Sequence, residues 1–133
     1  MARIDVDGLE LDYELIGDSF APPLVLTPGG RYARDTAGVP ELGRIFADKG
    51  YRVLLWDRPG CGASDIAFTA ESESVMNAQA LVGLVRELGL KDVKLVGGSA
   101  GSRISLMAAA RMPENVRKIA IWWISGGPVG LAG

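Results

Sequence analysis

One serine stands in a short glycine-rich segment whose composition suits a nucleophile on a sharp turn. The segment, Gly97–Gly101, reads Gly-Gly-Ser-Ala-Gly and follows the apolar run VKLV. G-x-S-x-G between a strand and a helix is typical of a serine whose hydroxyl attacks a carbonyl group. Such a serine needs a base, usually histidine, to take its proton. The sequence contains no histidine, so Ser99 is a candidate nucleophile without a local base.

Small residues around Ser99 are expected because the chain must turn sharply from strand to helix in a strained conformation. The backbone N–H of Ala100 would open the following helix, where it can donate a hydrogen bond to a developing oxyanion. The alternative is a glycine-rich turn that binds a phosphate group or only packs. The strand and helix patterns on either side of the segment favour the nucleophile.

Hydrophobic periodicity predicts the elements that must position this segment. Leu9–Gly17 alternates apolar and polar residues, which indicates a strand with one wet face. Apolar runs predict four core strands: Pro23–Gly30, Tyr51–Asp57, Val93–Gly98 and Val116–Gly127. Helical spacing predicts a helix with Leu42, Ile45 and Phe46 on one face, a second capped by Thr69 and ended by Gly89, and a third over Arg103–Arg111. The order predicts an α/β fold: a hairpin region, then a mostly parallel sheet with helices on both faces.

Three glycine-rich loops follow predicted core strands and therefore meet at one edge of the sheet. They are Pro28–Gly30, Asp57–Ser64 and Gly97–Gly101. Ligands of open α/β sheets bind outside the carboxyl ends of the strands. A ligand site is therefore expected where these loops converge.

These loops, in this order, resemble those of the α/β-hydrolase fold family, in its serine-nucleophile branch. The segment Asp57–Ser64 matches the family pattern D-x-P-G-x-G-x-S, in which the first Asp is structural in most members. VLTPGG resembles the strand and loop that give the family's second oxyanion-binding N–H, which implies that role for Gly30. Pro28 stands where the family has a structural histidine. The resemblance covers nearly the whole chain but only about half of a usual member, and it implies no cofactor.

In the family, the acid and then the histidine of the catalytic triad follow the nucleophile at a distance. The resemblance therefore implies that residues 1–133 are the N-terminal part of a hydrolase core that ends at the boundary to the cap. We expect the triad acid and histidine on a complementary C-terminal polypeptide, as in a split or processed heterodimer, because a sheet ending here would expose a hydrophobic edge. The implied function is a serine hydrolase of the esterase, peptidase or carbon–carbon hydrolase type, acting on a small molecule. The alternatives are a non-catalytic ligand-binding or interaction protein, and an enzyme in which Ser99 works without histidine.

Three further residues are candidates for substrate binding. Arg31 follows the predicted oxyanion loop and could meet an anionic substrate, although such arginines are often solvated or paired. Trp122 and Trp123 are adjacent on a predicted strand and point to opposite faces, so one of them could line the pocket while the other packs. Ser102 and Ser105 are expected to be ordinary helix residues.

Composition excludes several other classes of function. The net charge is −2 and the basic residues are scattered, which argues against a nucleic-acid partner. The single cysteine, Cys61, excludes an internal disulfide and has no nearby Cys or His with which to share a metal ion. No apolar segment is long enough to cross a membrane, and the amino terminus lacks the apolar core of a signal peptide. The predicted setting is the cytoplasm.

Overall fold

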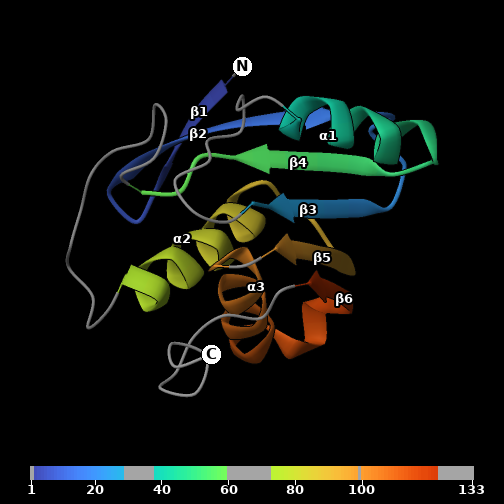
Figure 1. The fold of residues 1–133 in the computed structure, drawn as a ribbon. Coiled ribbons are helices and arrows are strands. Elements are labelled where there is room, and N and C mark those ends of the chain that lie inside the picture. Colours follow the sequence, from blue (N-terminus) through green and yellow to red (C-terminus); the bar gives the residue numbers. More distant parts are fainter. Residues whose placement is uncertain (1, 29–37, 60–72, 99, 123–133) are drawn as a thin grey trace.

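The computed structural model describes residues 2–28, 38–59, 73–98 and 100–122. In these ranges the chain forms a sheet of six strands, three α-helices and a short 3-10 helix (Figure 1). The strands are β1 (Ala2–Val6), β2 (Leu9–Ile16), β3 (Pro23–Thr27), β4 (Arg52–Trp56), β5 (Val93–Gly98) and β6 (Val116–Trp122). The helices are α1 (Val39–Asp48), α2 (Glu73–Glu87), α3 (Ala100–Arg111) and η1 (Pro113–Asn115).

The described strands lie in the order β1-β2-β4-β3-β5-β6. β1 and β2 form an antiparallel hairpin, and β2 pairs antiparallel with β4. From β4 onward the sheet is parallel, with β3 between β4 and β5 and with β6 beside β5. The predicted hairpin region followed by a parallel sheet is thus confirmed, and the carboxyl ends of the parallel strands share one edge.

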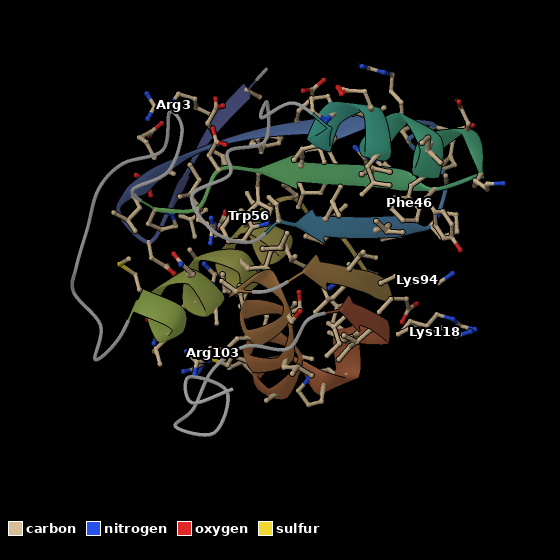
Figure 2. All side chains as sticks on the ribbon, viewed as in Figure 1. Arg3, Phe46, Trp56, Lys94, Arg103 and Lys118 are labelled. Atoms are coloured by element: carbon tan, nitrogen blue, oxygen red, sulfur yellow. The ribbon has the colours of Figure 1, made fainter. Side chains whose placement is uncertain are left out.

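Helices cover both faces of the sheet, as predicted. On one face α1 packs on a core cluster that includes Leu26, Leu55 and Val96. On the other face α2 and α3 pack on a larger cluster that includes Leu54 and Leu95. Figure 1 shows α2 and α3 together on the opposite side of the sheet from α1, and Figure 2 shows the side chains that fill the two layers.

Two details of the helices differ from the predictions. Ile45, which was predicted on the apolar face of α1, is 54% exposed, because Val39 and Gly43 define the buried face and Ile45 lies about 120° round the helix from Val39. α3 begins at Ala100 rather than at Arg103. No helix in the described ranges combines the length and apolar character needed to span a bilayer.

β6 departs from the prediction of a core strand. Within the described ranges β5 is its only partner, so β6 forms an edge of the sheet. Its residues 117–120 are exposed, and Ile119 is 38% exposed. The apolar run identified a strand, but burial depends on what lies beside it, and in the described residues nothing covers its outer side.

Candidate functional site

Three parallel strands end side by side where the predicted glycine-rich loops begin. β4, β3 and β5 are consecutive in the sheet, and Thr27 at the end of β3 is opposite Gly97 of β5. The arrowheads of the three strands point the same way in Figure 1. The loops Pro28–Gly30, Asp57–Ser64 and Gly97–Gly101 therefore start from neighbouring positions, as the prediction of a ligand site at this edge requires.

Lack of space makes glycine necessary at both ends of the G-x-S-x-G segment. A Cβ atom at Gly97 would overlap the backbone carbonyl of Gly101 and would lie 2.7 Å from Oγ of Ser105. A Cβ atom at Gly101 would overlap the carbonyl oxygen of Thr27 and would lie 2.9 Å from that of Pro28. Gly101, in the first turn of α3, therefore lies against the end of β3, and Gly97 lies against the start of α3. This close packing is what a nucleophile on a strand-to-helix turn requires.

Ala100 is the first residue of α3 and is half-buried. The N–H groups of a first helical turn have no partner inside the helix, and the helix dipole favours negative charge at this end. The position of Ala100 is thus the one expected for an oxyanion donor. Its role in binding an oxyanion stays a prediction.

Two serine side chains lie inside the molecule just beyond this turn. Ser102 and Ser105 of α3 are both 0% exposed. Oγ of Ser102 donates a hydrogen bond to the carbonyl oxygen of Gly97 at 3.2 Å. Oγ of Ser105 has no hydrogen-bond partner in the described part of the chain. The two hydroxyls share a helix and a level of burial but differ in bonding.

A buried hydrogen bond also joins the ends of β3 and β4. Nε1 of Trp56 donates to Oγ1 of Thr27 at 3.0 Å. The two residues are 1% and 0% exposed, and Figure 2 shows Trp56 between the sheet and the top of α2 and α3. This bond fixes the strand ends from which two of the loops leave.

Charged residues are buried beside the end of β4. Asp12, Asp57 and Arg58 are each 3% exposed or less, and each makes polar or electrostatic interactions. The backbone N–H of Asp57 donates to the carbonyl oxygen of Asp12 at 3.0 Å. Arg3 is opposite Asp12 in the hairpin register. Buried charge of this kind is stable only with partners. The structural role expected for Asp57 stays a prediction.

An ion pair on the surface shifts the pKa of one arginine. The hydrogen bond and the negative charge of Asp7 raise the pKa of Arg86, whose guanidinium lies 3.1 Å from the carboxylate. This pair links the β1–β2 turn to α2. Because both side chains are exposed, the pair contributes little to stability.

Several predicted site residues lie outside the described ranges, and their roles stay predictions: Gly30, Arg31, Ser99 and Trp123. Trp122 ends β6, and its backbone is opposite Gly98 in the register. The end of β6 is therefore beside the residue that precedes Ser99. In the described ranges, no group of three or more His, Cys, Asp or Glu residues could hold a metal ion.

Sequence reasoning missed two features of this edge. Ser102 lies in a helix as predicted, but its bond to Gly97 was not predicted, although its place three positions after Ser99 among small residues could have marked it as part of the turn. The bond between Thr27 and Trp56 left no local signal, because 29 positions separate the two residues.

Residues 22–122 match the family model described as alpha/beta hydrolase fold. The chain is 40% identical over 86 residues to the 2-hydroxy-6-oxo-6-phenylhexa-2,4-dienoate hydrolase of Comamonas testosteroni, a match that covers 65% of this chain and 29% of that protein. It is 40% identical over 117 residues to the 2-hydroxy-6-oxononadienedioate/2-hydroxy-6-oxononatrienedioate hydrolase of Burkholderia vietnamiensis (strain G4 / LMG 22486), covering 86% of this chain and 41% of that protein.

The fold is also similar to solved structures. A thermophilic esterase from Thermogutta terrifontis superposes with a TM-score of 0.81 at 21% identity, over 97% of this chain and 49% of the esterase. The present chain spans less than half the length of each of these three proteins.

Proposed function

We propose, from the premise that this chain belongs to the alpha/beta hydrolase fold family, that it supplies the nucleophile and the oxyanion-binding groups of a hydrolase. Ser99 is the nucleophile, and the N–H groups of Gly30 and Ala100 bind the oxyanion. The turn between β5 and α3 carries the proposal, because Gly97 and Gly101 have no room for a side chain there. A strand, a tight turn and a helix amino end form the context in which G-x-S-x-G provides a nucleophile.

The proposed reaction is acyl transfer to water. Oγ of Ser99 attacks the substrate carbonyl carbon while a base takes the hydroxyl proton, and the carbonyl oxygen becomes an oxyanion. The bond to the leaving group then breaks, and the protonated base delivers its proton to that group. Water attacks the acyl-serine with help from the same base and releases Ser99. The N–H groups of Gly30 and Ala100 stabilise both oxyanions, and losing one such donor typically costs about 100- to 1,000-fold in rate.

The base is the part of this scheme that residues 1–133 lack. They contain no histidine, and the nearby Arg103 carries a guanidinium that stays charged and cannot accept a proton near neutral pH. We therefore assign the base and its orienting acid to polypeptide outside residues 1–133. The greater length of the relatives supports this assignment, since the matched regions make up only 29% and 41% of the two relatives named above.

The exposed edge of the sheet supports the same assignment. Ile119 on β6 is 38% exposed and Leu106 on α3 is 39% exposed. Within the described residues, the outer side of β6 has no paired strand, and an open edge of this kind readily pairs with further chain. In the proposal, the polypeptide that carries the base extends the sheet from β6 and covers these side chains.

The named relatives suggest a substrate class. The phenyl compound in the name of the Comamonas testosteroni protein contains a ketone and no ester or amide, so its hydrolysis breaks a carbon–carbon bond beside the ketone. Serine attack on the ketone carbon, with the departing carbon taking the proton, is acyl transfer of the same kind. The compound is an anion, which agrees with Arg31 as a substrate contact. We propose 2-hydroxy-6-oxodienoates as the substrate class of the present protein.

Turnover of this compound tests the proposal. The complete protein that contains residues 1–133 is given 2-hydroxy-6-oxo-6-phenylhexa-2,4-dienoate, and consumption of the dienoate is followed by absorbance. We expect turnover by the wild type, a loss of at least about 1,000-fold in kcat for Ser99→Ala, and near wild-type turnover for Ser105→Ala. Ser105→Ala is the matched control, since it removes a buried serine hydroxyl that has no hydrogen-bond partner in the described residues.

Three outcomes are informative. Turnover lost with Ser99→Ala alone supports both the nucleophile and the substrate class. Hydrolysis of an ester such as p-nitrophenyl acetate without turnover of the dienoate retains the nucleophile and rejects the substrate class. Binding of the dienoate with no turnover of either compound favours the ligand-binding alternative.

A further inference from the structure

We propose that Ser102 is a positioning residue for the nucleophile turn. The inference rests on the proposed function, because it assigns Ser102 a part in placing Ser99 and the N–H of Ala100. Its basis is the hydrogen bond that Oγ of Ser102 donates to the carbonyl oxygen of Gly97 at 3.2 Å. Ser99 stands in the chain between these two residues, so the bond closes a ring of chain that contains the nucleophile.

This bond is not the usual one for a serine in a helix. A helical serine commonly bonds back to the carbonyl four residues earlier in the same helix. Ser102 instead bonds to a residue five positions earlier, which belongs to β5 and not to α3. The hydroxyl therefore joins the first turn of a helix to the strand that precedes it, across the turn between them.

Both ends of the bond are held by the rest of the fold. Gly97 lies inside the sheet, opposite Thr27 of β3 on one side and Ile121 of β6 on the other. The first turn of α3 is fixed by Gly101, which touches the backbone of Thr27 so closely that no Cβ fits. Ser102 is 0% exposed, and a hydrogen bond shielded from water is stronger than an exposed one. The bond thus resists rotation of the helix start relative to the strand end.

Rotation at this point would move catalytic groups. Ala100, whose N–H is the proposed oxyanion donor, opens the helix that Ser102 anchors. A misplacement of about 1 Å can cost up to about 100-fold in rate, even without loss of any contact to the substrate. The effect falls on the rate of the chemical step, because Ser102 is buried in the fold and touches no substrate.

Ser105 provides a matched control on the same helix. It is also 0% exposed, and its Oγ has no hydrogen-bond partner in the described part of the chain. Ser102→Ala and Ser105→Ala each remove one buried oxygen atom from α3. Only Ser102→Ala removes the bond to Gly97. A difference between the two variants therefore reports on the hydrogen bonding of the Ser102 hydroxyl, which includes the bond to Gly97.

The test is the rate of labelling by a fluorophosphonate probe, measured on the active protein with the base-bearing polypeptide present. We expect Ser102→Ala to lower the maximal inactivation rate about 10-fold and to leave the probe concentration at half-maximal rate within about 2-fold. Ser105→Ala is expected to match the wild type in both quantities. The pH midpoint of labelling is expected to be the same for all three proteins, because Ser102 does not exchange a proton with the probe.

A further variant separates positioning from folding. Ser102→Cys keeps a small, unbranched side chain but replaces the hydroxyl with a larger thiol that is a weaker donor, so an intermediate inactivation rate is expected even if Ser102→Ala folds poorly. Each rate is divided by the folded fraction measured by circular dichroism. Equal corrected rates for Ser102→Ala, Ser102→Cys and Ser105→Ala would overturn the inference while leaving Ser99 as nucleophile. A wild type that the probe does not label would instead overturn the proposed function, and this inference with it.

Discussion

Nε1 of Trp56 lies 3.0 Å from Oγ1 of Thr27, in a hydrogen bond that water does not reach. The bond joins the last residues of β4 and β3, the strands from which two of the three predicted site loops depart. It holds the carboxyl ends of β3 and β4 together independently of the loops that follow them.

Thr27→Val is expected to destabilise the protein by about 1–3 kcal/mol, because it leaves the buried N–H of Trp56 without a partner while keeping the shape of the side chain. Urea denaturation of the wild type and the variant measures this loss. The control is a double-mutant cycle with Trp56→Phe, in which the coupling between the two sites is expected to be about 1 kcal/mol. Purely additive effects would show that the bond contributes nothing to stability.

Gly101→Ala is expected to destabilise the protein by about 1–3 kcal/mol and to lower hydrolase activity by at least about 10-fold. The added Cβ meets the backbone of Thr27 and Pro28, which cannot move aside as a flexible side chain can. Thermal unfolding and kcat for the proposed substrate measure the two effects.

Gly43→Ala is the matched control for that substitution. Gly43 is also a buried glycine in a helix, but its added Cβ meets only the ends of side chains, at 3.3 Å from the methyl groups of Leu55. Alanine also favours the helix by about 1 kcal/mol over glycine. We expect stability within about 1 kcal/mol of the wild type and unchanged kcat. Equal losses of stability and kcat in the two variants would contradict the conclusion that Gly101 has no room for a side chain.

Strand and helix positions could be predicted closely because they depend on local patterns. The apolar run VKLVGG predicted β5, and Gly50 and Gly89 predicted the ends of α1 and α2. In the structure both glycines have positive φ angles, which glycine adopts without steric cost. Side chains around Ser99 were predicted to clash across the turn. The lack of room for a Cβ atom at Gly97 and Gly101 confirms that prediction.

Features that depend on contacts between distant segments could not be predicted. The exposure of Ile119 depends on what lies beside the outer side of β6, and the residues of β6 alone do not indicate this. The bonds of Thr27 and Ser102 each need the relative placement of two elements. Ile45 was misplaced because apolar spacing alone does not fix the centre of a buried helix face.

Ile119→Asp is expected to weaken the association of residues 1–133 with the polypeptide that supplies the base. A carboxylate at the open edge of β6 would have to be buried without a partner when that edge is covered. Co-expression of the two parts as separate chains, followed by affinity purification, measures the yield of the complex.

Ile45→Asp is the control, because Ile45 is an exposed isoleucine on α1 rather than on β6. It is expected to leave the yield unchanged. If both substitutions reduce the yield equally, β6 is not the surface that the second part covers.

The rate of fluorophosphonate labelling is expected to rise with pH, with a midpoint between about 6 and 7.5. The reason is that a histidine supplied from outside residues 1–133 must be neutral to accept the proton of Ser99, so labelling is slow below the pKa of that histidine. Stopped-time labelling from pH 5 to 9 gives the profile. A rate that does not change over this interval would exclude histidine as the base.

The location of the probe adduct tests the central claim most directly. After labelling of the active protein, trypsin releases residues 95–103, a peptide that contains Ser99 and Ser102 and whose fragmentation by mass spectrometry distinguishes the two. We predict the adduct on Ser99 when the base-bearing polypeptide is present, and none on residues 1–133 alone. An adduct on another residue, or no adduct in the complete protein, would contradict the assignment of Ser99 as the nucleophile.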